Sequence, residues 1–309
     1  MKIIFFGTSE FAVTALQALI KSEHDISFVV TQPRKERGRG LKLSPTEVEA
    51  YTQAEGIEAS ACKDVNSAEF IEHLKKSKAD IFVVVDFGQI LSDELLAIPK
   101  LFSLNIHASL LPKYRGAAPI QRAILDGEKE TGVTIMKITR QLDSGDIITR
   151  EKVGIEKSDD SVTLRTKLAS MGARLLLSAL KKIDNDNMVC TKQDESKATY
   201  AAKIKKEDGL IAWAGPAKKI INQVRACRPW PSAYTYLQSK MLKVLKAEVL
   251  DKAKPAQPGS VMEAKKDTII VACKDARILI TELQLEGKKP LSAAEFLRGY
   301  PLPEGKILG

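Results

Sequence analysis

The first 31 residues alternate between apolar runs and an amphipathic stretch. Residues 2–6 are almost entirely apolar, as expected for a strand buried on both faces, and residues 26–31 predict a second strand. Between them, residues 10–21 carry apolar side chains at helical spacing. Ser9 precedes this helix and is placed to cap it. This order predicts the β-α-β start of a parallel sheet.

The same alternation continues to about residue 183 and is then replaced by short strands. Further helices are predicted over 44–55, 67–77, 117–125 and 161–183, and further strands over 80–85, 103–108, 132–139 and 147–153. Short strand-like runs separated by turn residues follow at 233–237, 242–249, 260–264, 268–272 and 278–285. We therefore expect a doubly wound, mostly parallel α/β sheet and a second, small β-barrel.

The boundary between the two predicted domains lies in a polar stretch. Residues 189–206 have weak periodicity and are predicted as a linker. They separate a catalytic domain over residues 1–188 from a basic C-terminal barrel over residues 207–309. A length of 309 residues agrees with two domains.

Two polar side chains mark one strand as a candidate site. Asn105 and His107 leave the same face of the strand over 103–108, because alternate residues of a strand share a face. An amide NH2 can stabilise a developing oxyanion, and an imidazole can exchange a proton near neutral pH. Both lie near the carboxyl end of a strand, where doubly wound sheets bind ligands. An isolated Asn-x-His pair is more often structural than catalytic.

Composition excludes several other classes of protein. The four cysteines are scattered without a Cys-x-x-Cys, and the three histidines are far apart, so we expect reduced thiols and no metal site. The first turn holds only Gly7, which disfavours a dinucleotide site, and no phosphate-binding Gly-x4-Gly-Lys motif occurs. No signal peptide and no membrane-length apolar run is found, so the protein is expected to be cytoplasmic.

Charge distinguishes the two parts of the chain. Residues 1–204 hold 29 Lys and Arg against 28 Asp and Glu, whereas residues 205–309 hold 19 against 11. A compact basic domain is the electrostatic signature of nucleic-acid binding, although surplus lysine also keeps small domains soluble. A second cationic feature is a predicted loop over 32–44, which is either a solvated surface loop or an arm that contacts phosphates. Its basic residues are Arg34, Lys35, Arg37, Arg39 and Lys42.

Three longer strings give these features a family resemblance. Asn-Ile-His-Ala-Ser-Leu-Leu-Pro-Lys-Tyr-Arg-Gly at 105–116, Glu-Thr-Gly-Val-Thr-Ile-Met at 130–136 and Gln-Leu-Asp-Ser-Gly-Asp at 141–146 closely resemble the folate-dependent formyltransferases. The resemblance covers nearly the whole chain and is closest to the members that act on methionine carried by initiator tRNA. It implies a Rossmann-like catalytic domain and an OB-like second domain. It also implies 10-formyltetrahydrofolate as formyl donor, initiator Met-tRNA as acceptor, no metal and a monomeric enzyme.

The resemblance assigns roles to individual residues. Asn105, His107 and Asp143 match the catalytic trio of the family, and Asp146 is the rival carboxylate, which we interpret as a turn residue. The folate would bind to residues that match two stretches of the family pocket: Gln89, Ile90 and Leu91, largely through their backbone, and Ser109, Leu110, Leu111 and Pro112. The basic loop residues Arg34, Lys35, Arg37, Arg39 and Lys42 would contact the tRNA acceptor end. Asp86 and Phe87 depart from the pattern, since many relatives have a small or apolar residue followed by Tyr.

Related activities remain as alternatives at this point. A formyltetrahydrofolate hydrolase and a sugar-nucleotide amine formyltransferase share the trio and a similar second domain. Glycinamide ribonucleotide formyltransferase shares the trio, but its chain would end near residue 200. An RNA-binding protein with an inactive catalytic domain is a fourth interpretation, which the intact trio disfavours. The basic second domain and the 34–42 loop favour tRNA as the acceptor.

Overall fold

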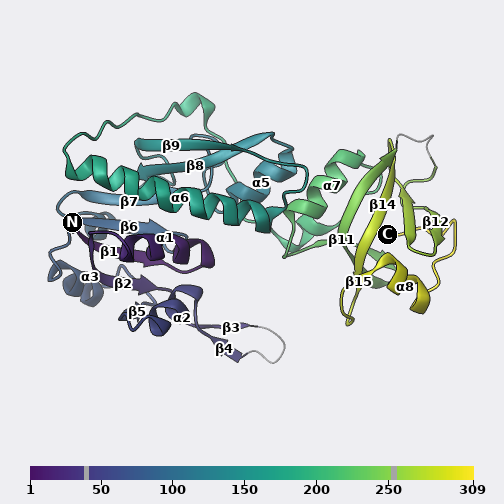
Figure 1. Cartoon of the computed structure of the whole chain (residues 1–309), viewed down its shortest axis with the longest axis horizontal. Helices are drawn as coiled ribbons and strands as arrows, with labels where there is room; N and C mark the ends of the chain where they lie inside the picture. Colours follow the sequence, from purple (N-terminus) through teal and green to yellow (C-terminus); the bar gives the residue numbers. More distant parts are fainter. Residues whose placement is uncertain (38–41, 252–255) are drawn as a thin grey trace. The chain divides into compact units, whose positions relative to one another are not determined.

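The chain forms two compact units in a computed structural model that describes residues 1–37, 42–251 and 256–309 (Figure 1). The first unit contains Met1–Pro119, Glu130–Gly154 and Arg165–Ala201. The second contains Ile120–Lys129, Ile155–Leu164 and Ala202–Gly309. Residues 189–201, predicted as part of a linker, thus belong to the first unit. In the described part of the chain, no helix has both the length and the apolar character needed to cross a membrane.

A seven-stranded sheet forms the centre of the first unit, in the order β5-β2-β1-β6-β7-β8-β9. The five strands β5, β2, β1, β6 and β7 are parallel, and β8 and β9 are antiparallel additions at one side. The mostly parallel α/β fold predicted from the sequence is therefore confirmed. The strands are β1 (Lys2–Gly7), β2 (Asp25–Thr31), β5 (Ala59–Ala61), β6 (Ile81–Val85), β7 (Phe102–His107), β8 (Glu130–Lys137) and β9 (Ile147–Gly154).

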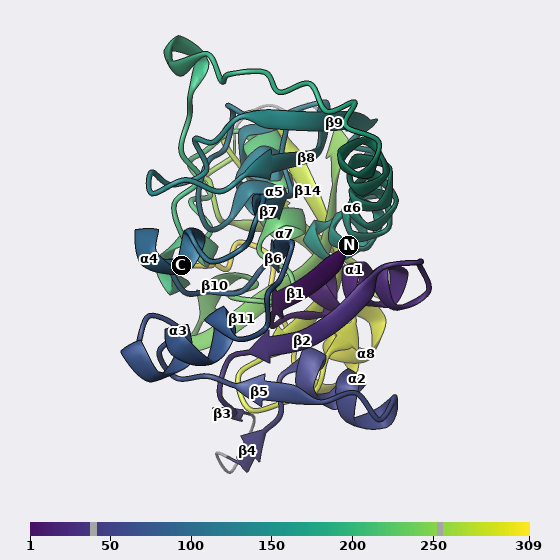
Figure 2. The same ribbon diagram turned by 90° about the vertical axis from the view of Figure 1, so that its left-hand side faces the viewer.

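Helices cover both faces of this sheet, which explains why its central strands are apolar on both sides. Figure 2 shows α1 and α6 on one face, and α3 and α4 on the other. All five residues of β6 are buried, and Phe6, Phe82 and Phe87 pack together in the core cluster. The helices over residues 1–184 are α1 (Glu10–Ile20), α2 (Glu47–Ala54), α3 (Ala68–Lys75), α4 (Asp93–Leu96), α5 (Pro119–Asp126) and α6 (Ser161–Asp184). Of these, α5 after Pro119 and the start of α6 up to Leu164 belong to the second unit.

Two local predictions for the first unit are wrong. The stretch over 32–44, predicted as a loop, contains the paired strands β3 (Lys35–Arg37) and β4 (Lys42–Ser44). Its base is closed by hydrogen bonds between the hydroxyls of Thr31 and Thr46 and from Arg34 to Glu49. These are side-chain pairs between residues fifteen positions apart, which local composition does not reveal. Ser9, predicted to cap α1, makes no side-chain cap hydrogen bond and donates to Asp86 instead.

The second unit is built on an antiparallel sheet in the order β10-β11-β14-β13-β12, with β15 paired to β14. Ile278, Ile280, Leu283 and Leu285 of β14 are buried, and they join residues of α7 and α8 in a separate apolar core. This confirms the prediction of a second, smaller β domain. Its elements are α7 (Ala217–Ala226), β10 (Ala233–Leu237), β11 (Lys240–Asp251), β12 (Val261–Lys265), β13 (Thr268–Ala272), β14 (Arg277–Leu285), β15 (Leu291–Ser292), α8 (Ala293–Gly299) and the short 3-10 helix η2 (Lys206–Gly209).

Candidate active site

The candidate site lies where β6 and β7 end side by side. Val84 of β6 is in register with Asn105 of β7, and both strands run in the same direction. Asp86 and His107 therefore mark the same edge of the sheet, as predicted. His107 is the last residue of β7 and is 5% exposed, whereas Asn105 is only partly buried. The strand alternation thus places an amide and an imidazole together at this edge.

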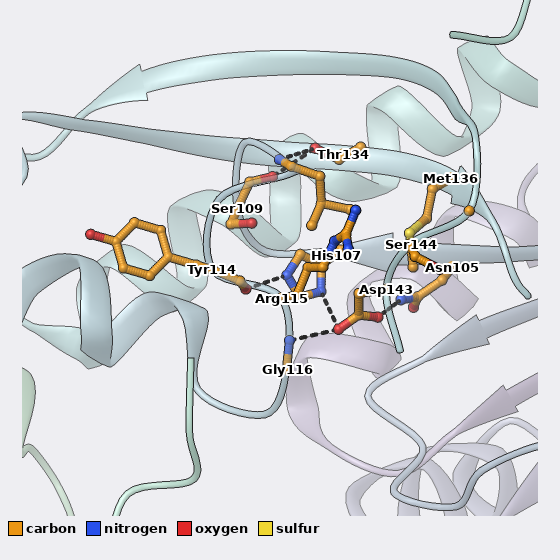
Figure 3. Close-up of polar contacts among 12 residues, drawn as sticks. Asn105, His107, Ser109, Tyr114, Arg115, Gly116, Thr134, Met136, Asp143 and Ser144 are labelled. Atoms are coloured by element: carbon orange, nitrogen blue, oxygen red, sulfur yellow. Dashed lines mark hydrogen bonds and ion pairs between the residues drawn. The ribbon is translucent and has the colours of Figure 1, made fainter. Parts of the chain in front are cut away.

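Asp143 reaches the same place from the turn after β8 and contacts both side chains (Figure 3). Its Oδ1 accepts from Asn105 Nδ2 at 3.4 Å, and its Oδ2 lies 3.6 Å from His107 Nδ1. Oδ2 also accepts a 2.7 Å hydrogen bond from the backbone N–H of Gly116. Only 12% of the Asp143 side chain is exposed. The structure therefore brings the three residues of the predicted trio into one network of contacts.

The hydrogen bonds restrict where protons can be on His107. Its Nε2 lies 2.8 Å from the backbone carbonyl oxygen of Tyr114, which can only accept, so Nε2 carries a hydrogen. Nδ1 faces the carboxylate of Asp143, and a second proton on the ring would lie there. The imidazole is thus held between a carbonyl and a carboxylate. This arrangement fixes the orientation of the ring.

The loop that follows β7 is built from internal hydrogen bonds. Ser109 is fully buried, and its Oγ donates to the carbonyl of Lys113 at 2.6 Å. Thr134 Oγ1 donates to the Ser109 carbonyl at 2.7 Å and accepts from the Leu111 N–H at 3.2 Å. Arg150 donates to the Leu111 carbonyl at 2.8 Å. Strands β8 and β9 therefore hold the loop whose Tyr114 carbonyl accepts from His107.

Two glycines are required by the close approach of backbone segments at the site. Gly116 has φ +112, and a Cβ there would lie 2.9 Å from the carbonyl oxygen of Ala201. A Cβ on Gly145 would lie 1.8 Å from the carbonyl oxygen of Lys137. A side chain at either position would displace the Gly116 N–H or the Asp143 turn. Gly116 and Gly145, which lie in the strings at 105–116 and 141–146, are thus part of the geometry that surrounds Asp143.

The residues predicted to bind the folate fall into two groups. Gln89 donates to the Cys62 carbonyl and accepts from the Val65 N–H, both at 3.1 Å, so its side chain holds a neighbouring loop. Ile90 is 77% exposed, whereas Leu91 is buried in the core.

In the second group, the side chains of Ser109 and Leu111 are interior, and Leu111 packs with Met136 and Ile147. Leu110 lies over Gly132, and Pro112 is partly buried. Side-chain contact with a ligand is therefore open to Ile90, Leu110 and Pro112 more than to the interior residues.

The unusual carboxylate at position 86 has specific partners. Asp86 Oδ2 accepts from Ser9 Oγ at 2.5 Å and forms an ion pair with Arg165 Nη1 at 3.2 Å. It has φ +45 and follows β6 directly. Its neighbour Phe87 is buried in the core, and the Phe87 carbonyl accepts from Thr8. Asp86 therefore links the first turn of the sheet to α6, beside the site.

The predicted cationic residues are only partly described. Arg34 is paired with Glu49, and its Nε and Nη2 both lie 2.8 Å from Oε1 of that carboxylate. The hydrogen bond to Glu49 raises the pKa of Arg34. Lys35 is exposed on β3. The backbones of Arg37 and Lys42 belong to the hairpin, but their side chains lie outside the described residues, and all of Arg39 lies outside them.

Sequence reasoning missed Thr134, Arg115 and Gln193. Arg115 is fully buried and contacts Gln193 and Glu195 of the segment predicted as a linker. Arg115 lies within the first sequence string, but no local pattern pairs it with residues about eighty positions later. In the described part of the chain, no group of three His, Cys, Asp or Glu residues is arranged to hold a metal ion.

Comparisons with known proteins identify the family that this fold and site define. Residues 1–180 match the formyl transferase family model, and residues 203–301 match the model of the formyl transferase C-terminal domain. The chain therefore belongs to the formyl transferase family, and the resemblance seen in the sequence is confirmed.

Two individual relatives are similar to this chain over its whole length. The chain is 44% identical over all of its length to methionyl-tRNA formyltransferase of Caldanaerobacter subterraneus, covering 100% of that protein. It is also 44% identical to methionyl-tRNA formyltransferase of Pelotomaculum thermopropionicum, with 100% of this chain and 99% of that protein covered.

Solved structures share the fold at lower identity. The sugar 3N-formyl transferase WlaRD matches with a TM-score of 0.67 and 22% identity, over 94% of this chain and 99% of that one. HypX from Aquifex aeolicus in complex with tetrahydrofolic acid matches with a TM-score of 0.65 and 18% identity, over 100% of this chain and 50% of that one. At these identities the likeness concerns the fold.

Proposed function

We propose that this protein transfers the formyl group of 10-formyltetrahydrofolate to the free amino group of methionine on initiator Met-tRNA. The observation that carries the proposal is the joint contact of Asn105, His107 and Asp143 at the carboxyl edge of the sheet. Relatives named methionyl-tRNA formyltransferase, 44% identical over the whole chain, support this acceptor over a sugar nucleotide or water.

The reaction needs no nucleophile from the protein. The methionyl nitrogen attacks the formyl carbon, and the C–N bond to N10 of the folate then breaks. One proton leaves the attacking nitrogen and one arrives at N10, so the protein must stabilise an oxyanion and move a proton. An amide, an imidazole and a carboxylate in one network supply both functions.

Asn105 would stabilise the oxyanion of the tetrahedral intermediate. Its NH2 has two hydrogens, and the 3.4 Å contact with Asp143 uses one of them. A donor of this kind typically contributes about 3 kcal/mol to the transition state. The partial exposure of Asn105 at the strand end is compatible with contact to the substrate.

Asp143 and His107 would act together on the proton. The carboxylate has its Oδ2 beside both His107 Nδ1 and the Gly116 N–H, which orients it within the site. The proton released by the amine would pass to the Asp143–His107 pair and then to N10. We keep Asp146 as a turn residue, because its carbonyl accepts from the Lys137 N–H at the end of β8.

The formyl donor would bind beside the ends of β6 and β7. Family membership and the tetrahydrofolate complex of a protein of the same fold support a folate. We propose the 10-formyl form. We assign its contacts to Gln89, Ile90 and Leu91 and to Ser109, Leu110, Leu111 and Pro112, with interior side chains contributing through the backbone.

The tRNA would be bound by basic surfaces in both parts of the chain. Lys35 and the hairpin over 35–44 would contact the acceptor end, with Arg37, Arg39 and Lys42 as further cations and Arg34 as their anchor on Glu49. The excess of eight positive charges in residues 205–309 would bind phosphates elsewhere on the tRNA. We further propose catalytic, linker and tRNA-binding regions over 1–188, 189–206 and 207–309, in a monomeric cytoplasmic enzyme.

The direct test is a transfer assay with 10-formyltetrahydrofolate and charged initiator tRNA. Formyl-methionyl-tRNA should accumulate at the rate at which tetrahydrofolate is produced. A reaction without acceptor measures hydrolysis of 10-formyltetrahydrofolate. A reaction with an amino sugar nucleotide measures transfer of the formyl group to that acceptor. Turnover of the folate without acceptor at the same rate would overturn the proposal in favour of a hydrolase.

A further inference from the structure

Residues 191–201, which belong to the first unit, lie along both loops of the candidate site. Thr191 and Ile147 exchange two 2.8 Å backbone hydrogen bonds at the start of β9. Further on, the Arg115 N–H donates to the Thr199 carbonyl at 2.8 Å, and the Ala201 N–H donates to the Arg115 carbonyl at 2.6 Å. Residues 191–201 are thus paired with the loop after β7 and with the strand that follows the Asp143 turn.

Gln193 of this segment reaches the Asp143 turn directly. Its Nε2 donates to the backbone carbonyls of Asp143 and Gly145, both at 2.8 Å. Its Oε1 accepts from Arg115 Nε at 3.1 Å and from Arg115 Nη2 at 2.8 Å. The opposite amide orientation would place oxygen against two carbonyls and NH2 against a guanidinium, so the hydrogen bonds define the orientation.

Arg115 is held in turn by Glu195. The guanidinium is completely buried, and it donates through Nη1 to Oε2 at 2.9 Å and through Nη2 to Oε1 at 2.7 Å. A bidentate pair of this kind fixes the plane of the guanidinium. The hydrogen bond from Arg115 lowers the pKa of Glu195, which favours the charged form of the carboxylate. Glu195, Arg115 and Gln193 therefore form one chain of charge-assisted contacts that ends at the Asp143 turn.

We propose that Gln193 is a positioning residue for the Asp143 carboxylate, supported by Arg115 and Glu195. The inference rests on the proposed function, because it assumes that Asp143 takes part in formyl transfer. Gln193 fixes the backbone carbonyl of Asp143 itself and that of the residue two positions later, in a turn where Asp143 has φ +48. Leu142, directly before it, is 55% exposed, so packing of this neighbour does not replace the hydrogen bonds.

The position of Asp143 matters because a catalytic site tolerates little displacement of its groups. Oδ2 of Asp143 must stay beside both His107 Nδ1 and the Gly116 N–H, and these contacts depend on where the turn backbone lies. Loss of the two hydrogen bonds from Gln193 would let the turn move away from β7. A displacement of about 1 Å at a catalytic group can lower the rate by about a hundredfold.

The test compares Gln193→Ala and Gln193→Glu with the wild-type protein. The glutamate keeps an oxygen toward Arg115 but replaces the donor that faces the two carbonyls. Both variants should lower kcat by about 10- to 100-fold, with the KM for 10-formyltetrahydrofolate and for Met-tRNA changed by less than about threefold. Unchanged kcat in Gln193→Glu would overturn the proposal.

A matched control exists in the second unit. Gln223 Nε2 also donates to two backbone carbonyls two residues apart, those of Asp208 at 2.7 Å and Leu210 at 2.9 Å. Gln223→Ala should lower the thermal midpoint about as much as Gln193→Ala and leave kcat unchanged. Equal loss of kcat in the two variants would assign the effect to general destabilisation and overturn the proposal.

A double-mutant cycle separates this inference from the function on which it rests. If Gln193 acts through Asp143, Gln193→Ala should lower kcat in the wild type and have little further effect in Asp143→Asn. Losses that multiply would overturn the positioning role alone. Absence of transfer to Met-tRNA by the wild-type protein would overturn the proposed function, and full activity of Asp143→Asn would overturn the role assigned to that carboxylate.

Discussion

At the scale of single residues, Asp143 is the centre of the candidate site. Asn105, His107 and Gly116 all contact its carboxylate, and its backbone carbonyl accepts from Gln193. Asn105 and His107 come from one strand, so their relative position follows from strand geometry. Asp143 comes from a turn 36 positions after His107, and its place depends on backbone contacts rather than on local propensity.

The amide of Asn105 should be needed in the transition state more than in binding. We expect Asn105→Ala to lower kcat by about 10²- to 10³-fold, because one oxyanion donor is removed. The KM for 10-formyltetrahydrofolate should change little. Steady-state kinetics with charged tRNA measure both quantities, and Asn187→Ala, at an exposed position after α6, serves as control. A large rise in KM with unchanged kcat would instead make Asn105 a binding residue.

At the scale of elements, the segment around η1 (Glu195–Lys197) has its own pH dependence. Lys197 is the main cause that lowers the pKa of Asp194 to about 2, and Ser196 adds to the shift. A lowered carboxyl pKa stabilises the folded state above the unfolded value of 3.8, and this stabilisation is lost as the pH falls toward about 2. We expect Asp194→Asn to lower the thermal midpoint at pH 6 and to match the wild type near pH 2.

Thermal unfolding followed by circular dichroism between pH 2 and 6 would measure this difference. Lys197→Met removes the main cause of the shift, and it should reduce the pH dependence in the same direction. A constant difference between Asp194→Asn and the wild type at every pH would contradict the assignment of the effect to this carboxylate.

The β3–β4 hairpin is the element whose charge should matter for tRNA. We expect a variant with Arg34, Lys35, Arg37 and Arg39 replaced by glutamine to raise the KM for Met-tRNA by at least about tenfold. Binding of tRNA should weaken with each cation that no longer neutralises a phosphate, while the proposed folate site beside β6 and β7 would be unchanged. Kinetics at fixed ionic strength measure both KM values.

Arg34 needs a separate control, because its ion pair with Glu49 anchors the hairpin. Glu49→Gln keeps the residue size and tests whether the anchor, rather than the charge of Arg34, affects tRNA. If the quadruple variant formylates Met-tRNA with an unchanged KM, the hairpin does not bind the acceptor.

Most elements could be predicted because their signals are local. β1, β6 and α6 follow from apolar runs and helical periodicity within a few residues of the observed bounds. The Arg115–Gln193 contact could not be predicted from the sequence, since it joins residues 78 positions apart and Gln193 lies in a polar stretch without periodicity. The hairpin was missed for the same reason, because side-chain pairs at its base override a composition typical of loops.

At the scale of the whole molecule, charge is distributed unevenly along the chain. With a near-neutral first part and a second part of net charge +8, the proposed binding of tRNA should be sensitive to salt, whereas the chemical step should not. The contacts among Asn105, His107 and Asp143 involve buried or partly buried groups, which salt screens weakly. Binding of a polyanion to an exposed basic surface releases counterions instead.

We therefore expect the KM for Met-tRNA to rise steeply with KCl, with a slope of about 3 or more in a log–log plot, which corresponds to about four neutralised phosphates. The kcat at saturating tRNA should stay nearly constant over the same range. Kinetics between about 50 and 200 mM KCl, with an uncharged osmolyte at equal osmolality as control, measure both. Replacement of four lysines in residues 205–309 by glutamine should reduce the slope, because fewer counterions are released. A slope near zero in the wild-type protein would mean that the surplus charge serves solubility rather than recognition of the tRNA.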